Sequence, residues 1–499
     1  MVTVDELKQR GMAAFQASQF ESAASLFDQA RKLAPKDPDV WNMLAVTSSI
    51  LGDVEAAEKG FRKVIRLQPK AHTVHNNLGT VLKDRGKLKE AERCYRKALD
   101  LMPSYAEAAN NLATLLRMNG DGEQALVFYQ QALALKPDYA EAYSNFGALL
   151  QEVGRVGDAL QSYRRAVELQ PTHPEWVFNY GCGLLEAGSF DDAQAVFHQL
   201  IQLAPQDARA WDGLCNAQLH QKQFESAITN GHKAIEFDPT NADAWFHLGV
   251  AYQSIKNSDK AIELYQKVLE LDAGHDSAQY FLAILGAVEV PDKSPTDYVK
   301  DLFDGYAETF DNALVNNLEY RTPTLLFEWV ERYIGETEKN LDIMDLGCGT
   351  GLIGPLFRNI AARLLGVDLS PKMVEKARER NVYDELFVDD LVPPLQDNKG
   401  ALDLVLAADV FVYLGDLDDV FAATVESLRA EGLFLFSTEK SESSDRYELR
   451  ESGRYAHAVP YVESLAKSHG FSVLSNDDVV LRKDGGRDIN GSIYALRLN

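Results

Sequence analysis

The chain lacks the features that mark membrane-embedded, disulfide-stapled and zinc-binding proteins. Its 499 residues include four cysteines, none in a C-x-x-C pair, so we predict neither a disulfide framework nor a metal site. No apolar run approaches the roughly 20 residues of a membrane-spanning helix. The first residues lack the basic and apolar regions of a signal peptide. We therefore expect a cytoplasmic protein without membrane insertion.

Positive charge is also scarce. Fifty Lys and Arg residues face 75 Asp and Glu residues, which gives a formal net charge of −25. Because nucleic-acid binding needs clustered positive charge, we do not expect a nucleic-acid partner. A neutral or basic protein partner remains compatible with this balance. The length exceeds what a single hydrophobic core normally serves, so at least two domains are expected.

The first half of the chain repeats with a period of 34 residues. Prolines recur at this spacing at Pro35, Pro69, Pro103, Pro137, Pro171, Pro205 and Pro239, and alanines at Ala23, Ala57, Ala91, Ala125, Ala159, Ala193, Ala227 and Ala261. A 34-residue helix–turn–helix period is typical of the tetratricopeptide repeat. We predict an all-α solenoid of eight repeats with a capping helix at 277–285, so that the repeat domain spans 1–288. Such solenoids present a concave groove.

A column of asparagines follows the same period in the first helices of four repeats: Asn77, Asn111, Asn145 and Asn179. A side-chain amide can both donate to and accept from an extended peptide backbone. The column resembles the asparagine ladder in the superhelical domain of nucleocytoplasmic O-linked N-acetylglucosamine transferase, which implies peptide binding. The alternative is that asparagine is simply common at this position of the repeat.

A glycine-rich turn follows an apolar segment in the second half. Residues 344–351 read Met-Asp-Leu-Gly-Cys-Gly-Thr-Gly, and a second apolar segment ends in Asp368, seventeen residues after Gly351. Glycines allow the backbone to approach a ligand closely. A strand, a glycine turn and a helix form the nucleotide-binding corner of a doubly wound α/β sheet. A carboxylate at the end of the second strand can bind both hydroxyls of a ribose.

Two cofactors fit this corner. Residues 349–354 match G-x-G-x-x-G, the dinucleotide fingerprint, which alone is a weak signal. Asp345 and Gly347 favour a cationic amino-acid cofactor instead, because its ammonium group requires a nearby carboxylate or carbonyl. The segment resembles motif I of class I S-adenosylmethionine-dependent methyltransferases, and residues 368–373 resemble their motif II. The resemblance covers about 298–499 and implies a Rossmann-like α/β domain there, after a linker at 289–297.

The remaining elements of such a domain are predicted in order. Ser370 can cap a helix over 371–380, with proline at its first position. Strands are expected at 364–367, 386–388, 403–406 and 433–437, and a closing pair at 479–482 and 492–496. A late antiparallel pair is usual for a methyltransferase sheet and unusual for a dehydrogenase.

The resemblance implies a set of cofactor-binding residues: Tyr306, Asp345, Gly347, Cys348, Gly349, Gly351, Asp368, Leu369, Met373, Asp389, Asp390 and Ala408. Asp389 or Asp390 would read the adenine amino group, or both are solvated acids. Tyr306 belongs to a segment, 306–311, that looks like the aromatic helix folded over the cofactor in small-molecule methyltransferases. The alternative is an amphipathic helix whose apolar face is Phe303, Tyr306 and Phe310.

Three residues are candidates for the catalytic centre. Asp409 either contacts the acceptor or caps the following turn, and Tyr413 either lines the methyl-transfer site or packs in the core. His457 is predicted in a loop before a helix near Pro460; its Gly-Arg-Tyr-x-His setting resembles a subgroup of methyltransferases fused to helical repeats. A structural histidine is the alternative. Arg454 binds an anionic substrate group or, as we expect, pairs with an acid.

These observations lead to three functional hypotheses. The first is methyl transfer to a protein, or to a group carried on a protein, recruited by the repeat groove. The second is a small-molecule O- or C-methyltransferase whose repeats serve assembly. The third is a scaffold that has lost catalysis, which the intact motif I disfavours. Methyl transfer mainly requires alignment of acceptor, methyl group and sulfur, so the sequence carries no signature of the acceptor.

Overall fold

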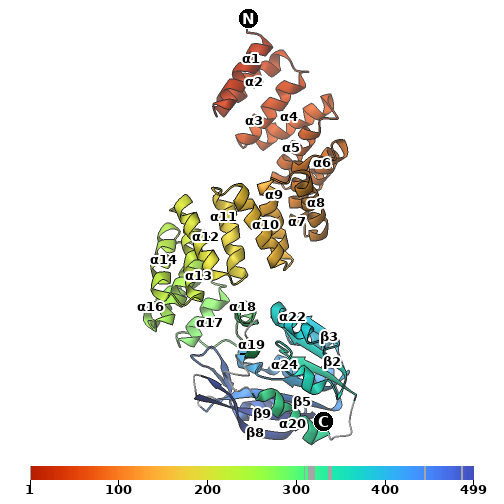
Figure 1. Cartoon of the computed structure of the whole chain (residues 1–499), viewed down its shortest axis with the longest axis vertical. Helices are drawn as coiled ribbons and strands as arrows, with labels where there is room; N and C mark the ends of the chain where they lie inside the picture. Colours follow the sequence, from red (N-terminus) through yellow and green to blue (C-terminus); the bar gives the residue numbers. More distant parts are fainter. Residues whose placement is uncertain (1, 308–309, 313–320, 335–339, 443–444, 485–486) are drawn as a thin grey trace. The chain divides into compact units, whose positions relative to one another are not determined.

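The computed structural model describes residues 2–307, 310–312, 321–334, 340–442, 445–484 and 487–499. The chain divides into two compact units, Met1–Phe237 and Asp238–Asn499. Helix pairs make up the first unit, and a sheet flanked by helices dominates the second (Figure 1). An α-helical solenoid followed by an α/β domain is the fold class that the sequence predicts. The division falls between the seventh and eighth repeats rather than at the linker.

The first unit contains seven helix pairs. They are α1 (Val4–Gln16), α2 (Phe20–Leu33), α3 (Pro38–Ile50), α4 (Val54–Leu67), α5 (His72–Asp84), α6 (Leu88–Leu101), α7 (Ala106–Met118), α8 (Gly122–Leu135), α9 (Ala140–Glu152), α10 (Val156–Leu169), α11 (Pro174–Glu186), α12 (Phe190–Leu203), α13 (Ala208–His220) and α14 (Phe224–Phe237). A glycine on one helix packs against an aromatic ring on the other. A Cβ on Gly79 would lie 2.6 Å from Tyr95, and one on Gly181 2.8 Å from Phe197. The close approach explains the small residue at this position of the repeat.

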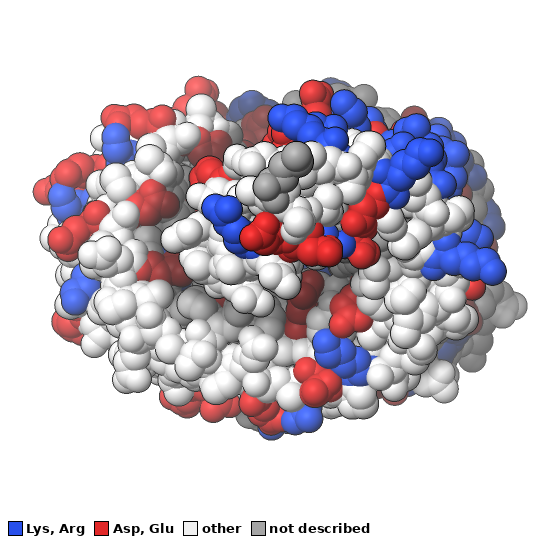
Figure 2. All heavy atoms as spheres, turned by 90° about the horizontal axis from the view of Figure 1, so that it is seen from above, with Lys and Arg blue, Asp and Glu red and all other residues white. Residues whose placement is uncertain are grey.

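Some acidic side chains of the repeats are paired with basic side chains. Glu58 is nearly buried, and although burial acts to raise its pKa, hydrogen bonds from Lys87, Arg62 and Arg85 lower it to about 2. Groups of acidic and basic side chains are separated by uncharged areas on the face shown in Figure 2. Among the helices of the described residues, none combines the length and apolar character that crossing a membrane requires.

The second unit begins with the eighth repeat, α15 (Ala242–Ser254) and α16 (Ser258–Leu271), and the predicted capping helix α17 (Asp276–Ile284). In the described part of the chain between α17 and the sheet lie α18 (Thr296–Tyr306), α19 (Phe310–Asn312) and α20 (Thr322–Ile334). The strands are β1 (Leu341–Leu346), β2 (Ala361–Asp368), β3 (Glu385–Val388), β4 (Leu402–Ala407), β5 (Leu428–Lys440), β6 (Tyr447–Leu449), β7 (Tyr455–His457), β8 (Phe471–Asp484) and β9 (Arg487–Leu498). The intervening helices are α21 (Gly354–Phe357), α22 (Pro371–Glu379), α23 (Val392–Asp397), α24 (Asp418–Ser427) and α25 (Val459–Ser468).

The sheet runs in the order β3-β2-β1-β4-β5-β7-β6, and β9 also pairs with β5 and β8. Strands β1 to β5 are parallel, whereas β9 is antiparallel to both β5 and β8. The predicted antiparallel closing pair is therefore present. The β6–β7 hairpin was not predicted, and His457 lies in β7 rather than in a loop.

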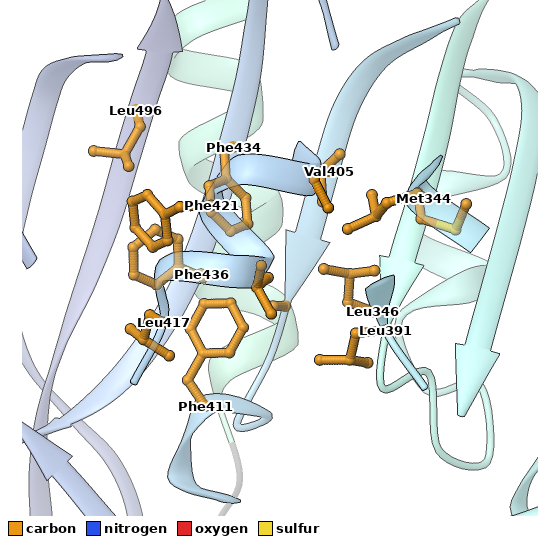
Figure 3. Packing of buried hydrophobic residues seen from close by; sticks show 14 of the residues in the cluster. Met344, Leu346, Leu391, Val405, Phe411, Leu417, Phe421, Phe434, Phe436 and Leu496 are labelled. Carbon is orange, nitrogen blue, oxygen red and sulfur yellow. The ribbon is translucent and has the colours of Figure 1, made fainter. Parts of the chain in front are cut away.

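Alternating residues of the strands bury two cores on the two faces of the sheet. Met344, Leu346 and Val405 face a cluster of phenylalanines, Phe411, Phe421, Phe434 and Phe436 (Figure 3). Ile343, Leu364 and Leu404 pack on the other face against Leu326 and Trp329 of α20. Because β1 to β5 are parallel, their carboxyl ends lie at the same edge of the sheet, and the loops that follow them meet there.

The predicted linker is packed on the second unit. Lys293 forms an antiparallel bridge with Leu414, and the Asp292 carbonyl accepts the N–H groups of Gly415 and Asp416. Tyr447 donates a 2.6 Å hydrogen bond to the Asp292 carboxylate. The segment between the capping helix and α18 is thus a structural part of this unit.

Candidate functional site

A cavity opens at the carboxyl ends of the parallel strands. Its wall comes from the linker, from α18, α19 and α20, and from the ends of β1, β2, β3 and β4 with the loops that follow them. Two arginines from later in the chain complete it. The lining residues are Lys293, Ser294, Thr296, Val299, Phe303, Phe310, Pro323, Asp345, Gly347, Cys348, Gly349, Thr350, Leu352, Ile353, Asp368, Leu369, Asp390, Leu391, Ala408, Asp409, Val410, Val412, Tyr413, Leu414, Arg454 and Arg482. This edge is where open α/β sheets bind ligands.

The glycine turn after β1 adopts the conformation that its sequence predicts. Gly347, Gly349 and Gly351 have φ values of 62°, 52° and 79°, a region that side chains disfavour. A Cβ on Gly347 would lie 2.6 Å from Val410, and one on Gly349 3.5 Å from Phe310. Position 347 therefore needs glycine for both its backbone conformation and its close packing, whereas position 349 needs it for its backbone conformation.

Two carboxyls flank this turn, Asp345, which is buried, and Asp368, which is half-buried. Asp345 lies at the end of β1, 1% exposed, and accepts a 2.7 Å hydrogen bond from the Tyr383 hydroxyl. Burial raises its pKa to about 7. Asp368 ends β2 and accepts the backbone N–H groups of Gly349 and Ser370, both at 2.9 Å. Burial raises its pKa to about 6.

These carboxyls fit the cofactor that the sequence implies. A buried acid with a raised pKa is stabilised in its charged form by a nearby cation, which the ammonium group of S-adenosylmethionine would supply. Each carboxylate oxygen of Asp368 accepts one hydrogen bond from the backbone. Each oxygen can accept a further one, so the carboxylate can bind two ribose hydroxyls. Asp345 would bind the ammonium group and Asp368 the ribose hydroxyls of the cofactor.

The helices before the sheet are tied to the same corner. Asp304 of α18 accepts a 2.5 Å hydrogen bond from Ser370, which caps α22 as predicted by accepting the N–H of Met373. Asp311 of α19 accepts from Thr350 and pairs with Arg380. Phe303 and Phe310 thereby form an aromatic wall over the glycine turn.

Most of the cofactor candidates lie in the cavity wall: Asp345, Gly347, Cys348, Gly349, Asp368, Leu369, Asp390 and Ala408. Gly351 shapes the turn, Met373 is fully buried in α22, and Asp389 is exposed, so none of these three lines the cavity. Tyr306 is the last residue of α18 and is 50% exposed outside the cavity wall. Glu308 and Thr309 of the predicted aromatic helix lie outside the described residues.

Asp409 and Tyr413 lie in the cavity wall after β4, but Asp409 is committed to an ion pair. Its φ is +57°, and its carboxylate contacts Arg482 at 2.7 Å and the Ser437 hydroxyl at 3.1 Å. Burial raises the pKa of the Tyr413 phenol, which keeps it protonated. This geometry suits positioning better than proton abstraction.

The structure does not bring His457 to the cavity. Its ring is fully buried beside β6, its Nε2 lies 3.1 Å from the Gly415 carbonyl oxygen, and burial lowers its pKa to about 4. The neutral His457 imidazole, which is hydrogen-bonded to backbone, therefore supports the β6–β7 hairpin. Sequence reasoning missed the linker residues Lys293, Ser294 and Thr296 in the cavity wall, because nothing in a proline-containing linker indicates docking.

Comparisons with known proteins find repeats in the first part of the chain and a methyltransferase domain in the second. A family model described as the cilia and flagella-associated protein 70 middle TPR-like domain matches residues 109–272, and tetratricopeptide-repeat models match 8–72 and 70–138. A model described as a methyltransferase domain matches 344–434. The solved structures of YrrB and of MamA from Desulfovibrio magneticus RS-1 match 38% and 34% of the chain. Their identities are 24% and 26%, their TM-scores 0.33 and 0.32, and the matches cover 96% and 97% of those chains.

The curated relatives are methyltransferases. A malonyl-[acyl-carrier protein] O-methyltransferase of Acetivibrio thermocellus is 33% identical over 107 residues, which is 21% of this chain and 37% of that protein. A ubiquinone biosynthesis O-methyltransferase of Bartonella quintana is 29% identical over 103 residues, 20% of this chain and 42% of that protein. This chain thus spans less than half the length of either relative. The cavity geometry and these matches show that the chain joins tetratricopeptide repeats to a class I S-adenosylmethionine-dependent methyltransferase domain.

Proposed function

We propose that the protein transfers a methyl group from S-adenosylmethionine to an acceptor on a protein, or to a small group carried by a protein, recruited by the repeats. The observation that carries the enzymatic part is the pair of carboxyls, the buried Asp345 and the half-buried Asp368, around a left-handed glycine turn. No feature of a docking scaffold requires that arrangement.

The cofactor would supply an activated methyl group, and the chain's own residues would align the acceptor and exclude water. The cavity wall contains apolar and aromatic side chains, among them Val299, Phe303 and Val412. Phe303 contacts Tyr413 edge-on, with ring centroids 5.4 Å apart. Alignment in a dry cavity is the main contribution that an enzyme makes to methyl transfer.

The asparagine column supports recruitment of a peptide. Asn111 donates to Asn76 at 2.9 Å, Asn145 to Asn110 at 3.2 Å, and Asn179 to Ser144 at 3.2 Å. Each amide thus uses one hydrogen to bridge consecutive repeats, which leaves its oxygen and second hydrogen for a peptide backbone. The name of the malonyl-[acyl-carrier protein] relatives likewise describes an acceptor attached to a protein.

The test is to incubate full-length protein with methyl-labelled S-adenosylmethionine and cell lysate, then separate proteins from small molecules. We expect label in the protein fraction, reduced several-fold by the double change Asn111→Ala and Asn145→Ala. A matched control, Asn398→Ala in the second unit, should leave labelling unchanged. Label confined to small molecules contradicts a protein-borne acceptor.

A second candidate is a small-molecule O-methyltransferase in which the repeats serve assembly. The aromatic wall of Phe303, Phe310 and Tyr413 favours it, as does the resemblance to an enzyme named for ubiquinone biosynthesis. This candidate predicts labelled small molecules, formed at the same rate by wild type and by the variant with Asn111→Ala and Asn145→Ala.

A further inference from the structure

Arg454 lies in the cavity wall, and its side chain donates no close hydrogen bond to a carboxylate among the described residues. Its nearest carboxylate oxygen, on Glu439, is 3.8 Å away, beyond hydrogen-bond distance. That carboxylate is already held more closely by Arg450, at 2.8 Å, and by Arg482. The Arg454 guanidinium lies close enough to the Tyr413 phenol to act against the rise that burial causes in the pKa of that phenol.

Arg482, beside it, is a second cation in the same wall and is 3% exposed. Its terminal nitrogens pair with Asp409 and Glu439, so its charge is neutralised within the protein. Its Nε is buried with no hydrogen-bond partner among the described residues. A buried N–H without a partner is costly, and an oxygen of a bound molecule would satisfy it.

The acceptor side of the cavity also offers no free base among the described residues. Asp409 is engaged by Arg482 and Ser437, and the Tyr413 phenol stays protonated. Lys293 and Asp390 pair across the cavity wall at 3.5 Å. An acceptor that must lose a proton, such as an ammonium or an alcohol, therefore meets no unpaired carboxylate among the described residues of this side of the cavity.

We infer that the methyl acceptor is a carboxylate bound by Arg454 beside the Tyr413 hydroxyl. This inference rests on the proposed methyltransferase function and specifies its acceptor. A guanidinium matches a carboxylate in shape and charge, and it can bind one oxygen while the other faces the methyl group. A carboxylate is ionised at neutral pH and needs no base.

The step balances without a proton transfer. The free carboxylate oxygen forms a bond to the methyl carbon as the bond between that carbon and sulfur breaks. The electron pair of the broken bond passes to sulfur, so a sulfonium and a carboxylate become a neutral thioether and a neutral methyl ester. The wall needs only to position the carboxylate, which suits a neutralised Arg482 and an Arg454 with no close carboxylate partner among the described residues.

The chemical stability of the product tests the acceptor. Full-length protein is incubated with methyl-labelled S-adenosylmethionine and cell lysate, and the product is treated with mild alkali. Methyl esters release labelled methanol in alkali, whereas methyl groups on nitrogen, carbon or alcohol oxygen do not. We expect most of the label to be released. Label that stays bound after alkali overturns the carboxylate assignment and leaves the proposed methyltransferase function standing.

Variants test the role of Arg454. Arg454→Gln should lower alkali-labile labelling at least tenfold by raising the acceptor KM, Arg454→Lys should lower it less, and both should bind S-adenosylhomocysteine within about twofold of wild type. Retained S-adenosylhomocysteine binding shows that the variants fold. The control is Arg446→Gln, a neighbouring arginine outside the cavity wall that pairs with Asp416. Undiminished labile labelling by Arg454→Gln overturns the assigned residue. A folded wild-type protein that fails to bind S-adenosylhomocysteine overturns the proposed function itself.

Discussion

The hydroxyl of Tyr280 donates a 2.5 Å hydrogen bond to the carbonyl oxygen of Gly453. Tyr280 belongs to the capping helix of the repeats, and Gly453 precedes the arginine that lines the cavity. Ser294 completes the connection, because its hydroxyl donates to Tyr280 at 2.9 Å and its N–H donates to the Tyr413 carbonyl. The end of the repeat array therefore supports the acceptor side of the cavity directly.

Tyr280→Phe removes this hydrogen bond while keeping the ring. A lost hydrogen bond of this kind corresponds to about 0.5–1.5 kcal/mol, so we expect the acceptor KM to rise roughly 2- to 12-fold. The affinity for S-adenosylhomocysteine should not change. The control is Tyr265→Phe, which loses a buried 2.7 Å bond to Gln253 within the eighth repeat. Equal effects of the two changes on the acceptor KM would contradict a role for Tyr280 in supporting the cavity.

The stability of the protein should depend on pH through the two carboxyls beside the glycine turn. The pKa of Asp345 rises to about 7 and that of Asp368 to about 6, from 3.8. Their stabilising contribution is complete below pH 4 and is lost as pH rises through 6 to 7, because the folded state holds protons that the unfolded state has released.

S-adenosylhomocysteine carries an ammonium group that favours the ionised carboxylates. Its stabilisation, measured as the increase in Tm, should therefore be larger at pH 8 than at pH 5.5, and Asp345→Asn should reduce the difference. An equal increase at both pH values would show that these carboxyls do not meet the ligand.

Gly347→Ala should lower the free energy of unfolding more than Gly400→Ala does. Gly347 and Gly400 have φ values of 62° and 59°, but a Cβ on Gly347 would lie 2.6 Å from Val410, whereas Gly400 has open space. The backbone conformation alone costs about 1–2 kcal/mol in either variant, and overpacking adds about 1–3 kcal/mol at Gly347. Chemical denaturation measures the difference. Equal losses would mean that the turn is less tightly packed than described.

Asp409→Asn tests whether Asp409 positions Arg482 or removes a proton. Removing one partner of a buried ion pair costs about 3–5 kcal/mol, so the variant should be strongly destabilised. Glu426→Gln is the control, because it disrupts an exposed pair with Lys399 worth about 0–1 kcal/mol. A positioning role predicts an unchanged pH profile for the residual methyl transfer. A stable variant whose activity falls and whose pH profile loses one ionisation would identify a base instead.

The features set by local chemistry were predictable from the sequence. The proline and alanine spacing gives the repeats, and the glycine turn with Asp345 and Asp368 gives the cofactor corner. Ser370 and Pro371 give the start of α22, where a capping side chain and a fixed proline φ act within a few residues. Each of these depends on neighbours along the chain.

The features that depend on distant contacts were not predictable. Strand β7 has three residues, too few for an alternation of apolar and polar residues to be recognised, so the sequence predicts a loop at His457. The Lys293–Leu414 bridge joins segments 121 positions apart, and the aromatic wall uses Phe303 and Phe310 rather than Tyr306 because packing selects among residues of one apolar face. Only the folded chain shows that Asp409 is neutralised by Arg482.

Calorimetric titration of the full-length protein with S-adenosylhomocysteine, comparing wild type with Asp368→Asn, tests the cofactor site most directly. We predict micromolar binding by wild type and at least a tenfold loss in the variant, because the neutral amide cannot accept both ribose hydroxyls in place of the carboxylate. A folded wild-type protein that shows no binding would contradict the methyltransferase account.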